Sequence, residues 1–169
     1  MTHEEYVIAA EHWDKKDATS KKVAKETLVE AIEKYIQANN TCAFASGFGD
    51  YIRCTPLEYA YHDGAFYFWS EGGKKFIGLE KNKKVCLAIY DKYQGFGVLN
   101  GLQVMGIATI IEPFSEAYVQ EATNKKIPLE VLKKLPEPLH LIEVEPKHYD
   151  FLSSSFQKDG YSSRQSLDL

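Results

Sequence analysis

The sequence predicts a mainly β protein in which antiparallel strands form a barrel and helices lie at its periphery. Six segments after residue 40 are rich in β-branched and aromatic residues, which is typical of strands. Some of them are apolar on both faces. In residues 102–111 one face carries Leu102, Val104, Ala108 and Ile110, and the other carries Met105, Ile107 and Ile111. Such a strand fits a barrel whose outside is covered by helices or by another subunit.

Two helices are expected before the first strand, at about residues 4–38. Residues 4–13 (EEYVIAAEHW) read as a short helix. The second helix would start at Ser20 as its N-cap, because apolar residues then recur at helical spacing: Ala24, Leu28, Ala31, Ile32 and Tyr35. The polar run QANN would end it.

The rest of the chain alternates between strand and helix patterns in an order that is not a regular βαβ repeat. The strand-like segments are 41–48, 51–62, 65–70, 85–91, 101–112 and 139–146. Asp63-Gly64 predicts a two-residue hairpin turn. Helices are expected over 74–82, 115–126 and 129–135. No linker divides the chain, so residues 1–169 are expected to form one domain.

Composition argues against several classes of function. The 20 Lys and Arg residues are outnumbered by 24 Asp and Glu residues, and the net charge of −4 does not favour nucleic-acid binding. No apolar run approaches the length that spans a membrane. Three separated cysteines indicate reduced, mostly buried thiols and therefore a cytoplasmic protein. The five histidines lack paired ligand spacing, so no metal site is expected, and no catalytic nucleophile is recognisable.

A set of cations on β elements is the strongest chemical pattern. Arg53 lies within an apolar strand, where a charge is costly unless it meets an anion or reaches an edge. Lys74 and Lys75 open the helix 74–82, and cations there suit a bound phosphate, with Ser70 as a further donor. The alternative is an exposed arginine and a solvated lysine pair.

These residues also resemble the pyridoxamine 5′-phosphate oxidase-like FMN-binding split barrels. The family pattern is Arg-x-Thr/Val-Pro, a strand, Asp-Gly, an aromatic strand ending in Thr/Ser, Gly-Ser-Lys/Arg-Lys and a helix ending near Asn-x-x-Val. Here it appears as RCTPLEYAYHDGAFYFWSEGGKKFIGLEKNKKV, and LQVMGIATIIE resembles a later strand. The resemblance covers residues 41–112 and implies an antiparallel split β-barrel.

The resemblance implies that Arg53 and Lys75 bind the phosphate of FMN, with help from Lys74 and Ser70. The two cations would then hold a phosphate dianion. Gly73 departs from the pattern, because the oxidases usually have serine there. Lys74 replaces an arginine that is common in the true oxidases.

The resemblance also implies a site for the flavin ring. The backbone of Cys54, Thr55 and Pro56 would run beside the polar edge of the ring, and Trp69 would line the site. Gln103 would approach the ring, from the second subunit if the chain forms the family's homodimer with FMN at the subunit interface.

The leading hypothesis is a flavoprotein that passes electrons between FMN and a small-molecule substrate or an electron donor such as NAD(P)H. The tail lacks the Arg-x-His substrate signature of the oxidases, and Arg164 is only a loose candidate, so FMN binding is better supported than pyridoxamine phosphate oxidation. A non-catalytic FMN-binding or electron-carrier module is the first alternative. A haem-binding or haem-degrading split barrel, with His62, His140 or His148 as axial ligand, is the second. A deazaflavin cofactor is a further possibility.

Overall fold

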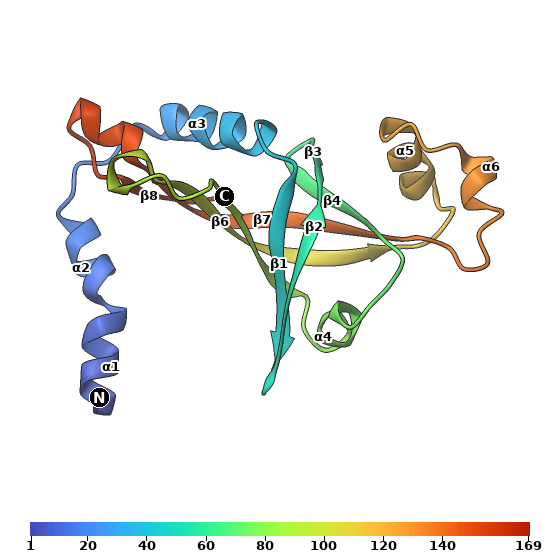
Figure 1. Ribbon diagram of the computed structural model, residues 1–169, viewed down its shortest axis with the longest axis horizontal. Coiled ribbons are helices and arrows are strands. Elements are labelled where there is room, and N and C mark those ends of the chain that lie inside the picture. The colour runs from blue at the N-terminus through green and yellow to red at the C-terminus, as the bar shows by residue number, and fades with distance from the viewer.

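The computed structural model describes residues 1–169 and contains one curled antiparallel sheet of eight strands (Figure 1). The strand order is β2-β1-β5-β6-β7-β4-β3, and β8 pairs with β7. The strands are β1 (Thr41–Phe48), β2 (Tyr51–Glu58), β3 (Ala60–His62), β4 (Ala65–Ser70), β5 (Lys84–Tyr90), β6 (Asn100–Ile111), β7 (His140–Ser153) and β8 (Arg164–Asp168). This confirms the predicted fold class.

One edge of β7 pairs with two different strands along its length, and this divides the sheet into two branches. The opposite edge of β7 pairs with β6 over its whole length. The branching edge pairs with β4 over residues 140–144 and with β8 over residues 148–152. Strand β7 therefore runs well beyond the predicted end at Pro146, where the register shifts opposite Met105 and Gly106. Strand β8 was not expected from the sequence.

Six helices surround the sheet, and they are α1 (His3–Ala10), α2 (His12–Ala18), α3 (Lys25–Gln37), α4 (Lys75–Lys81), α5 (Glu116–Asn124) and α6 (Leu129–Leu132). Figure 1 shows α3 along one side of the sheet, α4 beside β1 and β2, and α5 with α6 at the far end from α1. None of the six combines the length and the apolar character that crossing a membrane requires. That residues 1–169 form one domain stays a prediction.

The N-terminal helices differ from the predicted ones. The expected helix 4–13 is interrupted at Glu11, so that α1 and α2 are separate. Ser20 is not an N-cap, because its hydroxyl donates to the carbonyl of Asp17 at the end of α2. Helix α3 instead begins at Lys25 after Ala24. The predicted apolar stripe is still used, since Leu28 and Ile32 are buried.

The core lies between the inner face of the sheet and α3. Phe44, Phe68, Leu87 and Val104 are inaccessible to solvent. Buried Tyr59 links this core to α3, because its hydroxyl donates a hydrogen bond of 2.7 Å to the carbonyl of Ile36 on α3. Burial of these side chains is the main favourable term that holds the curled sheet to the helix.

The outer face of the sheet is only half covered. On β6, Leu102, Val104 and Ala108 are buried as predicted, whereas Met105 and Ile107 on the opposite face are half-buried. No helix of the chain covers that second face completely. The chain by itself therefore leaves part of the apolar surface on this second face exposed to solvent.

Two further predictions concern turns and thiols. Asp63 and Gly64 have φ values of 53° and 76°, which confirms a hairpin turn with both central residues in the left-handed region. The cysteines are free, as expected, but they are not mostly buried. Cys42 is buried and Cys86 is half-buried, whereas Cys54 on the edge strand β2 is exposed.

Candidate functional site

Strand β2 and helix α4 bring Arg53 and Lys75 together beside β1. Ser46 on β1 lies opposite Arg53 in the register, and its hydroxyl donates to the carbonyl of Lys75 at 3.5 Å. Gly78 allows α4 to lie this close, since a Cβ there would stand 3.1 Å from Oγ of Ser46 and 3.3 Å from the amide nitrogen of Gly47. Tight helix-to-strand packing thus fixes the two cations relative to each other.

The ammonium of Lys75 is held inside the loop that precedes α4. The side chain of Lys75 is buried, with 5% of its surface exposed. Its Nζ donates a hydrogen bond to the carbonyl of Gly72 and lies 5.2 Å from the centre of the Phe76 ring. Burial, and next the positive charge of Arg53, lower the pKa of Lys75.

No carboxylate compensates these two charges. Neither Arg53 nor Lys75 forms an ion pair with an aspartate or glutamate, although other lysines of the chain and Arg164 do. The Arg53–Lys75 corner, defined by these two side chains and the loop 71–74, is therefore a local excess of positive charge with one member desolvated. An anion placed between them would relieve both the repulsion and the desolvation.

The loop that carries Lys75 is shaped by glycine and by Ser70. Gly72 and Gly73 have φ values of 136° and 105°, a region that other residues rarely adopt. Serine at Gly73 would therefore be strained in this loop conformation. The hydroxyl of Ser70 accepts from the amide of Gly72 at 3.1 Å and donates to its carbonyl at 3.0 Å. Ser70 thus orders the loop around Lys75. Lys74 is exposed, and its carbonyl accepts a hydrogen bond of 2.7 Å from Tyr51.

The predicted backbone segment lies on the edge of the sheet. Strand β2 pairs only with β1, so the main-chain groups on its other edge face no strand. Thr55 shares the inner face with Arg53, whereas Cys54 and Pro56 point to the outer face, as strand alternation requires. Accessible edge groups of this kind are suited to hydrogen bonding with a planar ligand.

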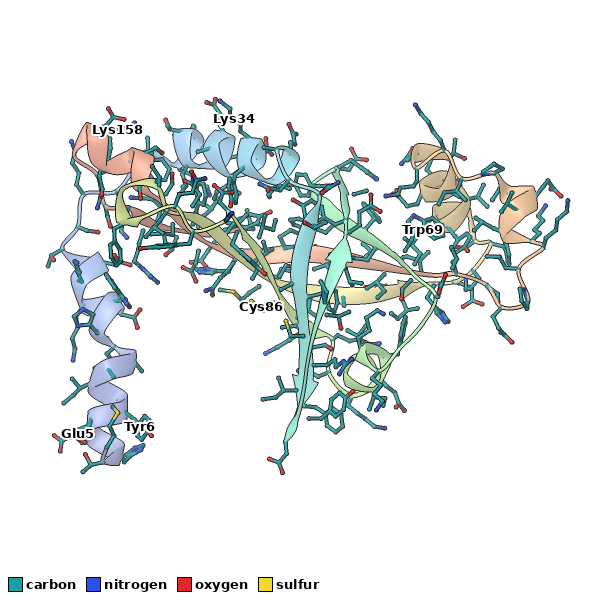
Figure 2. The ribbon with its side chains drawn as sticks, in the orientation of Figure 1. Glu5, Tyr6, Lys34, Trp69, Cys86 and Lys158 are labelled. Atoms are coloured by element: carbon teal, nitrogen blue, oxygen red, sulfur yellow. The ribbon has the colours of Figure 1, made fainter.

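Gln103 and Trp69 lie apart from the Arg53–Lys75 corner in this chain. The register places Pro56, Ala43, Ala88 and Gln103 in one row across four strands, so Gln103 is about 14 Å from β2. Trp69 lies beneath α5 (Figure 2). Its ring centre is 4.8 Å from that of Tyr118 on α5, and its indole Nε1 is buried without a partner.

Gln103 lines the wall of a cavity of about 260 Å³ on the outer face of β5 to β8. The lining residues with polar side chains are Tyr90, Gln103, Asp150, Arg164, Gln165 and Ser166. The guanidinium of Arg164 is engaged elsewhere, because it stacks on Trp13 and its Nε lies 3.9 Å from Asp17. Arg164 therefore anchors α2.

The structure reveals a second charged cluster that the sequence analysis did not identify. His62 Nε2 lies 2.7 Å from Oε2 of Glu121, a buried residue of α5, and Nδ1 lies 3.1 Å from Asp63. The imidazole also stacks on Tyr67 at 4.5 Å. Burial by itself lowers the pKa of His62, but the two carboxylates raise it by more. Glu121 is 59 positions away along the chain, so no local motif could have indicated the pair.

His148 on β7 is placed similarly between two carboxylates. Its Nδ1 lies 2.6 Å from Asp168 and its Nε2 lies 3.3 Å from Asp150. Burial lowers the pKa of His148 and the two aspartates raise it by more. Of the three histidines named as axial-ligand candidates, only His140 has no carboxylate partner, and its ring packs against Phe76 at 4.7 Å.

Comparison with known proteins identifies the family of this chain. A family model described as pyridoxamine 5′-phosphate oxidase matches residues 28–153, which is most of the chain. The chain belongs to the pyridoxamine 5′-phosphate oxidase family. The match includes every residue of the Arg53–Lys75 corner and ends at the last residue of β7. No curated protein sequence matches the chain.

Solved structures with the same fold have little sequence in common with this member of the pyridoxamine 5′-phosphate oxidase family. An FAD-binding protein from Mesorhizobium loti is 19% identical with a TM-score of 0.59, covering 72% of this chain and 89% of its own. General stress protein 26 from Bacillus anthracis is 20% identical with a TM-score of 0.59, covering 84% and 98%. The haem storage protein HutZ from Vibrio cholerae is 15% identical with a TM-score of 0.56, covering 70% and 89%. These similarities show a shared fold.

Proposed function

We propose that the protein is an FMN-dependent oxidoreductase that binds the cofactor phosphate with Arg53 and Lys75. The supporting observation is the pair of cations without a carboxylate, one of them buried. The phosphate monoester of FMN carries a charge of about −2 near pH 7 and several strong acceptor oxygens. Such a group would compensate both cations, with Arg53 as a two-pronged donor and Lys75 as a point charge.

The remaining predicted contacts follow the same arrangement. Lys74 would add charge at the entrance to the loop, and Ser70 would act by ordering the loop around Lys75. The exposed edge of β2 at Cys54, Thr55 and Pro56 would offer main-chain groups to the polar edge of the ring. Trp69 lies beneath α5 and apart from the Arg53–Lys75 corner, so it would line the site away from the phosphate.

We further propose that the protein is a homodimer with the cofactor at the subunit interface. The chain exposes 10830 Å², whereas a compact monomer of its mass exposes about 8,400 Å². Met105 and Ile107 on the outer face of β6 are only half-buried. Because Gln103 lies three strands away from β2, it would reach the ring from the second subunit.

Bound FMN would supply the electron-transfer chemistry. The chain would bind and orient it between β2 and the partner's outer face and limit the access of water. A small-molecule substrate and a donor such as NAD(P)H would meet the ring at that interface. No side chain of the Arg53–Lys75 corner is placed as a general acid or base, so we assign no catalytic residue.

Titration of the purified protein with FMN, riboflavin and FAD tests the proposal. Flavin fluorescence should be quenched on binding, and FMN should bind at least about 30-fold more tightly than riboflavin, which lacks the phosphate. Equal affinities for FMN and riboflavin would refute the phosphate site. NADH or NADPH bleaching the bound flavin would support an oxidoreductase, whereas a flavin that neither donor reduces would favour an electron-carrier module. Light scattering that shows a monomer with FMN bound would refute the dimer.

A haem titration tests the alternative that the protein binds haem, as the haem storage protein HutZ of the same fold does. Of the three histidines expected as axial-ligand candidates, His62 and His148 are already held by carboxylates. We therefore expect no Soret band shift on adding haemin. A shift that disappears in His140→Ala would replace the flavin proposal by haem binding.

A further inference from the structure

The N-terminal arm, defined as α1 and α2, projects from the body of the protein (Figure 1). Neither helix contains a buried residue. Several large apolar side chains of the arm are nevertheless present and exposed, namely Tyr6 at 63%, Val7 at 40%, Ile8 at 56% and Trp13 at 42%. Large apolar side chains gathered on an isolated element usually mark a surface that packs against something else.

The sequence nevertheless specifies α1 as a helix. Thr2 and Glu5 form a reciprocal capping box, with the Glu5 amide donating to the Thr2 hydroxyl at 3.2 Å and the Thr2 amide donating to the Glu5 carboxylate at 2.6 Å. A helix of eight residues is marginal in water without packing. A capped but unpacked helix of this length would therefore gain stability by packing against another molecule.

The root of the arm is fixed to the body. The Trp13 ring lies 4.7 Å from the guanidinium of Arg164 on β8. Asp17 lies 3.8 Å from Lys22 and 3.9 Å from Arg164, so it ties α2 to the start of β8 and to the segment before α3. The arm thus leaves the body in a set direction, which lowers the entropy cost of docking its tip.

The direction of the arm points to a second copy of this chain. Figure 2 places Glu5 and Tyr6 at the tip of the arm on the same side of the sheet as Cys86, whereas Lys34 on α3 lies on the other side. Cys86 belongs to the half-covered outer face. The solvent-accessible surface of the chain, 10830 Å², is larger than the value of about 8,400 Å² expected for a compact monomer of its mass. The difference is larger than the area of about 800 Å² that one subunit buries in an interface of standard size.

We propose that α1 of one subunit packs against the second subunit of the homodimer. The inference rests on the proposed dimer and adds a part of its interface that the barrel faces do not provide. Acidic Glu4 on α1 has a complementary charge on the body, where Lys84 at the start of β5 is exposed. The contact would be isologous, with each arm reaching the other subunit.

Photocrosslinking from the arm tests this directly. The full-length protein would carry p-benzoylphenylalanine in place of Tyr6, be irradiated with FMN present, and be run on a denaturing gel. We expect a product of twice the chain mass. The matched control places the same residue at Lys34 on α3, which should give no such product. A Tyr6 crosslink that stays at the mass of one chain, or no crosslink at all, would overturn the proposal if light scattering shows a dimer.

A second variant measures the contribution of the arm to dimer affinity. Ile8→Glu should weaken dimerisation at least about tenfold, as measured by the concentration dependence of light scattering. Val131→Glu on α6 alters an apolar side chain of similar exposure, 53% against 56%, and should leave dimerisation unchanged. An unchanged dimer in Ile8→Glu would contradict the arm contact. A wild-type monomer would instead remove the dimer itself and with it the arm contact, while FMN binding would stand as a separate result.

Discussion

Two corners of the molecule bury a charged side chain, and they do so in opposite ways. Glu121 on α5 is 3% exposed and meets His62, Asn124 and, through His62, Asp63. Lys75 on α4 is 5% exposed and meets a neutral carbonyl and the like charge of Arg53. The first corner contains its own counter-charge. The second corner lacks one.

The difference separates a structural cluster from a binding site. A buried charge with a partner is tolerated because attraction offsets desolvation, and removing either partner is destabilising. A buried charge beside a like charge lowers stability unless a ligand supplies the counter-charge, and perturbed groups of this kind gather at functional sites. Changes in the Arg53–Lys75 corner should therefore alter ligand binding, whereas a change at Glu121 should alter stability alone.

The largest effect is expected for Arg53→Ala on FMN affinity. Loss of one charge-assisted contact to a phosphate costs about 2 kcal/mol or more, which corresponds to a factor of about 30 in the dissociation constant. Isothermal titration calorimetry with FMN measures the loss. Riboflavin binding should hardly change, because riboflavin never makes the contact.

Lys83→Ala is the matched control for Arg53→Ala, because it removes an exposed cation just after α4. It should lower FMN affinity by less than about twofold. Equal losses of FMN and riboflavin in Arg53→Ala would mean that Arg53 supports the fold or the ring. An unchanged FMN affinity in Arg53→Ala would mean that Arg53 is a surface residue that does not contact the phosphate.

Lys75→Met should change binding and stability in opposite directions. FMN affinity should fall about tenfold, while the protein without flavin should gain roughly 1 kcal/mol in the free energy of unfolding because a desolvated cation is gone. Urea unfolding with and without FMN measures both effects. A variant that loses stability without flavin would show that the ammonium of Lys75 is needed for the loop itself.

The same contrast explains what could be predicted from the sequence. The Arg53–Lys75 corner is built from residues 53–78, close together in the chain, so strand and turn patterns could place its parts in order. The Asp63-Gly64 turn and the glycines of the loop have local conformational causes. The strands β1 and β4 were therefore found with their observed bounds.

The parts that were missed depend on contacts distant in sequence. His62 finds Glu121 only because α5 packs on β4, and no local pattern carries that information. Strand β8 is short and polar, and it forms because the free edge of β7 beyond residue 147 accepts it. The start of α3 was misplaced because Ser20 bonds backward to Asp17 instead of capping forward.

Glu121→Ala should act on stability and leave the flavin site alone. We expect a loss of roughly 2 kcal/mol in the free energy of unfolding, since the change removes a buried side chain and the partner of His62. FMN affinity should stay within about twofold of the parent. Chemical denaturation and FMN titration on the same preparation give the two values. A large loss of FMN affinity in a well-folded variant would show that the two corners are coupled through β4.

The smallest effect concerns the pH dependence of stability. The carboxylates of Asp63 and Glu121 outweigh burial and raise the pKa of His62 above its value in the unfolded chain. The stability that protonated His62 contributes to the folded protein is therefore fully present below about pH 6.5. It is lost as the pH rises through the folded-state pKa of His62. His148 behaves in the same way through Asp168 and Asp150. In His62→Gln the decline in stability between pH 6 and pH 8 should become shallower by less than about 1 kcal/mol, and the share due to His148 should remain. Urea unfolding at both pH values measures this difference, and a decline as steep as that of the parent would show that the His62–Glu121 pair does not titrate on folding.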